Sequence, residues 1–117
     1  MSKYNNAKVY EIICNISGKR YIGSTCETLL CRRLAGHVSM YKKWQKKLGL
    51  YYSSFQILEK NDYYINLLEK VNCLIKDELL SRERHYINTL ECVNKNIPLR
   101  TSKEYYQDNI TTIKNYK

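Results

Sequence analysis

Glu83 is a carboxylate in the middle of an apolar stripe. Residues 76–90 have helical spacing, and on such a helix Leu79, Ile87 and Leu90 surround Glu83. Burying an unpaired charge costs several kcal/mol, so Glu83 must have a partner or lie at the rim of a cleft. The partner is either an arginine or tyrosine hydroxyl in the core, or a metal ion. In the second case Glu83 is a metal ligand or a general base.

Two tyrosines, Tyr10 and Tyr21, lie on opposite strands of a predicted β-hairpin, residues 8–14 and 19–24. With a four-residue turn, Tyr10 lies opposite Gly23, and both phenols project from one face as diagonal neighbours. Gly23 then leaves a notch through which a ligand can approach the sheet. The alternative is that both tyrosines are ordinary packing residues.

Arg33 and His37 are four residues apart on a predicted helix over residues 28–47, with Trp44 on the same side. An arginine beside a histidine is suited to binding a phosphate, although a solvated helix face has the same pattern. Gly49 follows the lysine-rich end of this helix and is expected to cap it.

Positive charge is concentrated in one half of the chain. Residues 1–60 contain eleven Lys and Arg against three acidic residues, whereas residues 61–117 contain nine against eight. Such a distribution favours a polyanion as partner, because each neutralised phosphate releases counterions. The candidate contacts to a nucleic-acid backbone are Arg32, Lys42, Lys43, Lys46 and Lys47.

The remaining elements that must position these residues are a short helix or turn near 53–58 and a third strand over 63–71. Together they predict one α/β domain of the α+β type over residues 1–100, followed by a polar tail, 101–117.

No apolar run is long enough to cross a bilayer and the start lacks a secretory signal. We therefore expect an intracellular protein, cytoplasmic or nuclear, with five reduced cysteines. Lys, Asn, Ile and Tyr make up 48 of 117 residues, which suggests an AT-rich genome such as that of a virus or phage.

Five blocks of sequence share their order and spacing with a known family. The blocks are Lys8-Val9-Tyr10, Tyr21-Ile22-Gly23-Ser24-Thr25, Arg33 with His37, Arg82-Glu83-Arg84-His85-Tyr86-Ile87, and Cys92-Val93-Asn94-Lys95. In this order they resemble the GIY-YIG endonuclease domain, over about residues 7–97. Lys8-Val9 replaces the Gly-Ile of the family name, and Tyr10 keeps the tyrosine of that block.

This resemblance implies metal-dependent hydrolysis of DNA phosphodiesters on a small, mainly antiparallel three-stranded sheet flanked by helices. Glu83 resembles the family's single metal ligand, for Mg²⁺ or Mn²⁺. Arg33 matches the arginine that stabilises charge on the phosphate, and Tyr10 the tyrosine that orients or deprotonates the attacking water. Tyr21 and His37 match its hydrogen-bonding companions, and Asn94 the asparagine near the end of the domain.

Several alternatives stay open. Arg32 competes with Arg33 and Asn96 with Asn94, although only Arg33 has the four-residue step to His37. A catalytically inactive nucleic-acid-binding module of the same fold would need the same basic helix.

Nearby positive charge is expected to lower the pKa of Tyr10 enough for it to act as a base. About 20 residues lie beyond the core. We therefore expect either that the protein has low specificity or a short recognition site, or that the chain is the catalytic part of a longer protein. Homing, restriction-like and structure-specific activities are not distinguished.

Overall fold

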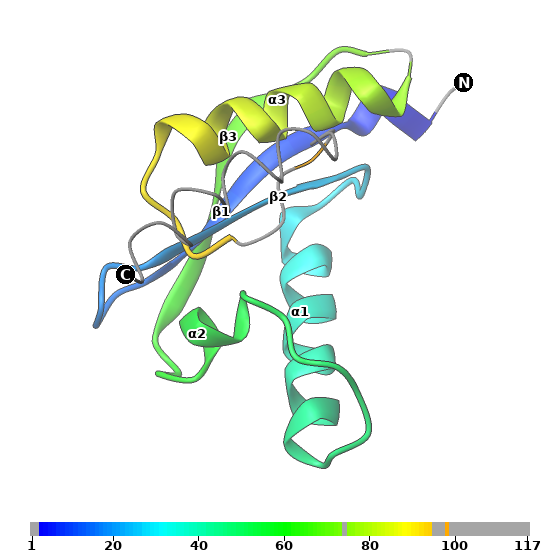
Figure 1. Cartoon of the computed structure of the whole chain (residues 1–117). Helices are drawn as coiled ribbons and strands as arrows, with labels where there is room; N and C mark the ends of the chain where they lie inside the picture. The colour runs from blue at the N-terminus through cyan, green and yellow to red at the C-terminus, as the bar shows by residue number, and fades with distance from the viewer. Residues whose placement is uncertain (1–2, 74, 95–97, 99–117) are drawn as a thin grey trace, which may run out of the picture.

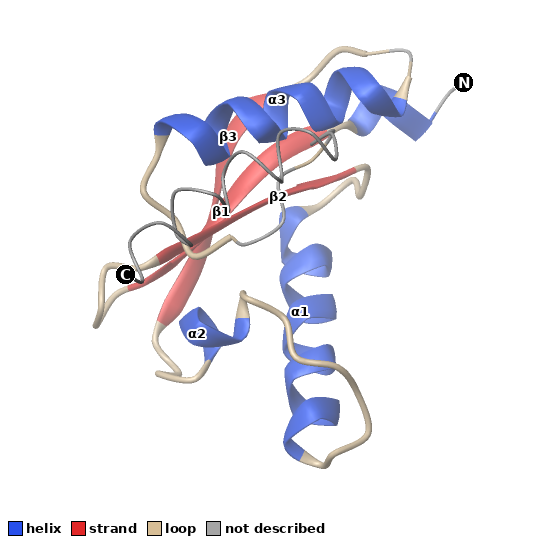
Figure 2. Cartoon of the chain, viewed as in Figure 1, coloured by secondary structure: helices blue, strands red, loops and turns tan. Residues whose placement is uncertain are grey.

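The computed structural model describes residues 3–73, 75–94 and 98. Figure 1 shows the order of elements, and Figure 2 the same view by type of structure. The elements are the 3-10 helix η1 (Lys3–Asn6), strands β1 (Lys8–Cys14), β2 (Arg20–Thr25) and β3 (Tyr63–Lys70), and helices α1 (Leu30–Gln45), α2 (Phe55–Leu58) and α3 (Lys76–Thr89). The predicted elements are therefore confirmed. The polar tail, 101–117, and Asn96 lie outside the described residues.

The sheet is antiparallel throughout and has the order β2-β1-β3, with β1 in the centre. In the hairpin Tyr10 pairs with Gly23 and Ile12 pairs with Tyr21, which confirms the predicted register. Gly18 has a φ of 74° in the turn, a conformation that glycine adopts without steric cost. The central strand is buried on both sides, so it is nearly continuous in apolar residues rather than alternating.

Helices cover both faces of the sheet: α3 lies on one, and α1 with α2 on the other (Figure 1). Alternation along β1 sends Val9 into a core with Leu79 and Ile87 of α3. It sends Tyr10 and Ile12 into a second core, beneath α1 and α2. Side chains on neighbouring strand positions therefore belong to different layers.

Helix α1 ends differently from expectation. Lys47, rather than Gly49, takes the left-handed conformation, with a φ of 63°. The Lys47 N–H donates to the Trp44 carbonyl and the Leu48 N–H to the Lys43 carbonyl, both at 2.9 Å. These two bonds satisfy the last carbonyls of the helix and offset the strain of a non-glycine residue there. The prediction of a Gly49 cap was wrong by two residues.

Helix α3 is fastened to β3 by an ion pair. The Arg82 Nε and Nη2 donate to the Glu69 carboxylate at 2.9 and 2.7 Å, and the Tyr86 hydroxyl donates to it at 2.9 Å. These contacts fix the rotation of α3 about its axis, which sets the direction of Glu83.

The five cysteines are all free thiols, as expected. None of the helices in the described residues is long and apolar enough to cross a bilayer.

Candidate active site

Tyr10 is the centre of a buried hydrogen-bonded group. Its hydroxyl lies 2.8 Å from His37 Nε2 and accepts a hydrogen bond from Arg33 Nε at 3.0 Å. Both partners come from α1 and are one turn apart, so they reach the same oxygen from one face of the helix. Arg32 projects elsewhere and is exposed, so Arg33 is the arginine that joins this group.

His37 is held from both sides and is 2% exposed. Its Nδ1 lies 3.1 Å from the hydroxyl of Ser54, which directly precedes α2 and has no exposed surface. Burial, and secondarily the positive charge of Arg33, lower the pKa of His37 to about 4. The ring is therefore neutral at pH 7, with one donor and one acceptor for its two partners. The ring of Tyr21 packs edge-on against it, with centroids 5.3 Å apart.

The predicted notch at Gly23 is filled by Tyr10 itself. A Cβ atom at Gly23 would lie 2.5 Å from the Tyr10 hydroxyl oxygen and 2.6 Å from its Cζ. Gly23 therefore lets the phenol cross β2 on its way to α1, rather than leaving a gap for a ligand.

Glu83 approaches from the opposite face of the sheet. It is half-buried on α3, and burial raises its pKa, while hydrogen bonds with the side chain and backbone of Ser24 and the charge of Arg33 act to lower it. Its negative charge in turn contributes to raising the pKa of Tyr10 and Tyr21. Edge strand β2 is thus where residues from both layers meet.

The expected lowering of the Tyr10 pKa does not occur. Tyr10 has no exposed surface, and loss of hydration raises the pKa of its phenol. The opposing effect of Arg33 is smaller, because a single partly hydrated cation does not replace the full hydration of a phenolate. The expectation of a phenol already activated by positive charge was wrong.

Asn94 contacts the backbone of β2. Its Nδ2 donates to the Ile22 carbonyl at 2.6 Å, and its Oδ1 accepts the Ile22 N–H at 2.8 Å. The Val93 N–H also donates to the Arg20 carbonyl, at 2.8 Å. This segment therefore satisfies polar groups along the outer edge of the strand that contains Tyr21 and Gly23.

The environment of Glu83 fits a hard divalent cation. Among the described residues no salt bridge reaches Glu83, and there is no cluster of three or more His, Cys, Asp or Glu. A half-buried carboxylate without an ion-pair partner can bind one cation whose other ligands are water and phosphate oxygens, as Mg²⁺ prefers. Of the two earlier interpretations of Glu83, a core carboxylate in an arginine salt bridge is not what the described part of the chain contains.

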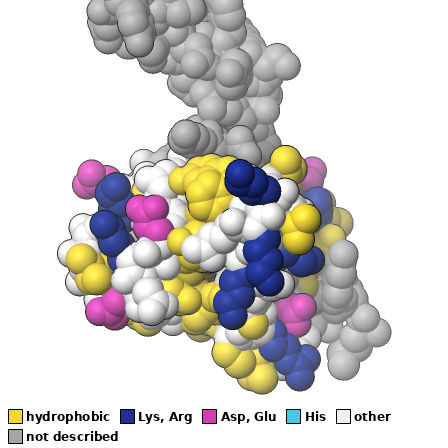
Figure 3. All heavy atoms as spheres, turned by 90° about the horizontal axis from the view of Figure 1, so that it is seen from below, with side chains coloured by type: hydrophobic (Ala, Val, Ile, Leu, Met, Phe, Trp, Pro, Cys, Tyr) yellow, Lys and Arg dark blue, Asp and Glu magenta, His cyan; other side chains and the backbone are white. Residues whose placement is uncertain are grey.

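The four lysines among the candidate DNA contacts lie apart from this centre, whereas Arg32 is next to Arg33 in the first turn of α1. Lys42, Lys43, Lys46 and Lys47 are exposed at the far end of α1. Figure 3, which views the molecule from below, shows a band of Lys and Arg side chains with hydrophobic side chains beside it. Lys42, Lys43 and Lys46 also line a shallow groove of about 640 Å³ along the helix.

Two residues of the site were not identified from the sequence. Ser24 is within the second motif block, and strand alternation from Tyr21 and Gly23 places it on the α3 face, where Glu83 is. That signal was available. Ser54 lies in an irregular segment 17 residues from His37 in the chain, and no spacing rule links the two.

Comparison with known proteins gives one match. A family model described as the GIY-YIG catalytic domain matches residues 6–96. A search of curated proteins and a search of solved structures returned no match. The matched range includes every described element from β1 to α3.

Proposed function

The chain belongs to the GIY-YIG family, and from that premise we propose that it is a divalent-metal-dependent endonuclease that hydrolyses phosphodiester bonds in DNA. Domains of this family are nuclease domains that act on nucleic acids and generally use divalent metals. The observation that supports activity in this chain is the convergence at β2. There Tyr10 and Arg33, which are hydrogen-bonded to each other, both interact electrostatically with half-buried Glu83, which has no salt-bridge partner in the described residues.

Glu83 is the residue that would hold Mg²⁺ or Mn²⁺. Bound there with water and phosphate oxygens, the ion would neutralise charge on the phosphate and increase the acidity of its water. The hydroxyl and backbone of Ser24 favour the ionised form of this carboxylate. Such support from a neighbouring hydroxyl and amide is what orients a metal ligand before the ion binds.

Arg33 is suited to stabilising charge on the reacting phosphate. Its Nε–H is used by Tyr10, and no hydrogen bond among the described residues uses its two terminal nitrogens. A guanidinium fixed at Nε can present those nitrogens to two phosphate oxygens. Removing such a donor typically costs about 10²–10³ in rate.

Tyr10 acts in this proposal by orienting Arg33. Its hydroxyl has no exposed surface and its raised pKa keeps it protonated at pH 7. Neutral His37 accepts the Tyr10 proton in a hydrogen bond at Nε2 and donates from Nδ1 to Ser54. The lone pairs of the phenol are then directed at Arg33. A chain of hydrogen bonds that runs from Ser54 through His37 and Tyr10 therefore fixes the Arg33 guanidinium. Asn94 and Tyr21 act as further positioning residues, through the β2 backbone and the His37 ring.

The decisive variant is Glu83→Gln, which keeps the size of the side chain and removes its charge. We expect loss of Mg²⁺-dependent nicking of supercoiled plasmid, with the fold and DNA binding retained. Mg²⁺ should raise the Tm of the wild type and not that of Glu83→Gln. Glu91→Gln, at an exposed position just after α3, makes the same charge change and should behave as wild type.

Cleavage by the wild type in excess chelator, or undiminished cleavage by Glu83→Gln, would contradict the metal-ligand role. A protein that binds DNA with strong salt dependence and never nicks it in Mg²⁺ or Mn²⁺ would instead be the inactive binding module of this fold.

A further inference from the structure

Three half-exposed aromatic rings surround one buried ring at the end of α1. Trp44, Tyr51 and Tyr52 are 37%, 49% and 45% exposed, whereas Phe55 of α2 is 1% exposed. Their ring centroids lie 5.5, 5.4 and 5.7 Å from that of Phe55. Phe55 therefore holds the three outer rings in fixed orientations while part of each stays accessible to solvent. We call Trp44, Tyr51 and Tyr52 the aromatic platform.

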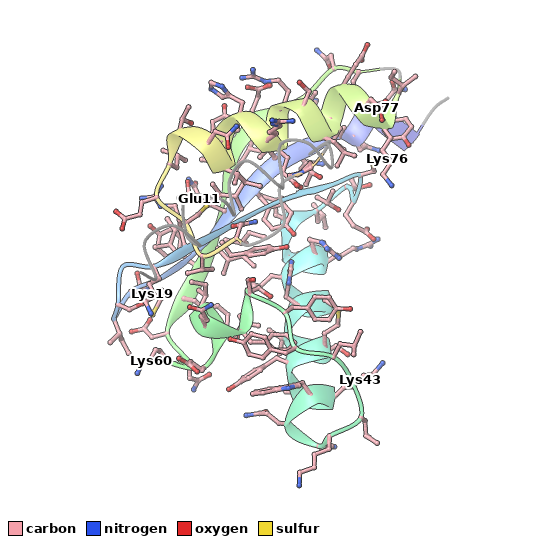
Figure 4. All side chains as sticks on the ribbon, in the orientation of Figure 1. Glu11, Lys19, Lys43, Lys60, Lys76 and Asp77 are labelled. Atoms are coloured by element: carbon pink, nitrogen blue, oxygen red, sulfur yellow. The ribbon has the colours of Figure 1, made fainter. Side chains whose placement is uncertain are left out.

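The surroundings of the platform are positively charged. Residues 28–58 contain six Lys and Arg and no Asp or Glu. Four of these cations, Lys42, Lys43, Lys46 and Lys47, are exposed on the helix end that contains Trp44. The stick view of Figure 4 places Lys43 at this end of the molecule, far from the labelled Lys19, Lys60 and Lys76. The platform is therefore complementary to an anion that also offers flat apolar faces.

The platform is aligned with the candidate active site. Arg33, His37 and Trp44 lie on one face of α1, at steps of four and seven residues. At 1.5 Å per residue, Trp44 is about 10–16 Å along the helix from the other two. That span corresponds to about three to five nucleotides of a stacked strand, at roughly 3.4 Å each.

The chemistry distinguishes single strands from duplex. In a duplex the faces of the bases are covered by their neighbours, so an aromatic side chain cannot stack on them. In an unpaired segment the faces are free, and rings beside a positively charged groove are the usual means of binding it. Lysines alone would be sufficient to hold a duplex backbone and would leave the exposed rings without a role.

We propose that the aromatic platform stacks on unpaired nucleotides of the substrate. The preferred substrate is DNA with a single-stranded segment about three to five nucleotides from the scissile phosphate. This inference rests on the proposed nuclease function for the position of the cut, while the binding itself can be measured without cleavage.

Trp44 is the only tryptophan of the chain, so its fluorescence reports directly on the platform. The full chain is titrated in chelator with oligothymidine and with a blunt two-stranded duplex of equal charge that has no unpaired nucleotides. We expect oligothymidine to quench Trp44 strongly and the duplex to bind with little quenching. Tyr51→Leu should weaken oligothymidine binding by about 5- to 100-fold, the usual effect of removing one stacked ring, and should leave duplex binding unchanged.

Tyr64→Leu is the matched control. Tyr64 is 46% exposed, but it lies on β3 in register with Ile13, on the face of the sheet away from α1. The control should bind both ligands as the wild type does. Cleavage in Mg²⁺ is then mapped on a duplex with an overhang and on a blunt duplex, and Tyr51→Leu should lower the rate on the overhang substrate alone.

These experiments distinguish a failure of the platform proposal from a failure of the proposed nuclease function. Quenching by oligothymidine without any cleavage would retain the platform and contradict the nuclease function. Cleavage of both substrates without any effect of Tyr51→Leu would support the nuclease function and contradict the platform proposal. The platform proposal is also overturned if Trp44 responds to anionic lipid vesicles and not to oligothymidine, or if its emission changes with protein concentration alone because a second copy covers it.

Discussion

Burial shifts the pKa values of the two hydrogen-bonded side chains at the centre of the site, Tyr10 and His37, in opposite directions. It raises the pKa of the Tyr10 phenol and lowers that of the His37 imidazole to about 4. Both changes favour the uncharged form, because neither a phenolate nor an imidazolium is well hydrated there. At pH 7 the pair is neutral, and the other ionisable side chains of the site are Arg33 and Glu83.

The buried histidine makes stability depend on pH. Unfolded His37 binds a proton near pH 6.5, whereas the folded form resists protonation until about pH 4. The unfolded state therefore binds more protons in this window, and stability falls as the pH is lowered through it, by up to about 3 kcal/mol. Urea unfolding at pH 7 and pH 4 should show this loss in the wild type and much less of it in His37→Gln. His85→Gln, at an exposed position, should keep the wild-type dependence; equal dependence in all three proteins would show that His37 is not the group that titrates.

Replacing Tyr10 by Phe tests whether the phenol orients or deprotonates. The change leaves Arg33 Nε and His37 Nε2 without a partner, at a cost of about 1–3 kcal/mol in the free energy of unfolding. A misdirected guanidinium should lower single-turnover cleavage by roughly 10²-fold. If Tyr10 only orients Arg33, the pH–rate profile of Tyr10→Phe keeps the wild-type shape.

If instead Tyr10 is the base, its raised pKa means that the wild-type rate rises steadily from pH 7 to 9 and that Tyr10→Phe loses this rise. Tyr21→Phe is the control, since among the described residues its hydroxyl has no hydrogen bond, and it should cleave nearly as wild type.

At the scale of elements, β2 is the strand that joins the two halves of the site. Tyr21 and Gly23 face α1, whereas Ser24 faces Glu83 on α3, because successive residues of a strand point to opposite sides. As an edge strand it lies within reach of both layers. Asn94 and Val93 hold its outer edge, so a displacement of β2 would move both groups at once.

Gly23→Ala should damage this arrangement. The added Cβ would lie 2.5 Å from the Tyr10 hydroxyl oxygen, which His37 and Arg33 hold in place and which cannot easily yield. We expect a loss of about 1–3 kcal/mol in stability, measured by urea unfolding, and a large loss of cleavage.

Gly36→Ala makes the same change within α1, where a Cβ meets no atom within 4 Å. Alanine is the better helix former, so this variant should be as stable as the wild type or up to about 1 kcal/mol more stable. Equal behaviour of the two alanine variants would contradict the close approach of Tyr10 to β2.

At the scale of the whole molecule, charge and chemistry are in different places. The catalytic candidates come from β1, β2, the first half of α1 and α3, while the exposed lysines lie at the other end of α1, where Figure 4 labels Lys43 (Figures 1 and 4). Phosphate contacts there would hold DNA without taking part in hydrolysis.

Changing Lys42, Lys43, Lys46 and Lys47 together to Gln should flatten the plot of log Kd against log salt. The slope should fall by up to about 0.9 for each duplex phosphate that these lysines neutralise in the wild type. A charge-matched variant with Lys19, Lys60, Lys70 and Lys76 changed to Gln removes the same formal charge from exposed positions elsewhere. Fluorescence anisotropy over a salt series measures both, and equal slopes would mean that only net charge attracts the DNA.

The elements, the hairpin register and the family could be predicted from the amino-acid sequence alone. These follow from local signals: Gly18 and Asn15 in a turn, β-branched and aromatic residues along β1, helical spacing around Glu83, and the order of the motif blocks. The pairing of Tyr10 with Gly23 follows from the turn length alone. Each of these depends on residues close in the chain or on a fixed period, so each was readable without a structure.

The interactions between these residues depend on how the layers pack, and the sequence did not predict them. Hydration is lost when layers pack together, so the direction of the Tyr10 pKa shift, raised rather than lowered, depends on α1 covering β1. The contact of Ser54 with His37 and of Asn94 with Ile22 joins segments 17 and 72 residues apart, for which the chain has no local signal. The same is true of the helix end at Lys47, where two hydrogen bonds outweigh the preference for glycine. Burial and long-range contacts are properties of the packed molecule, and they convert a set of motif residues into a site with defined charges and hydrogen bonds.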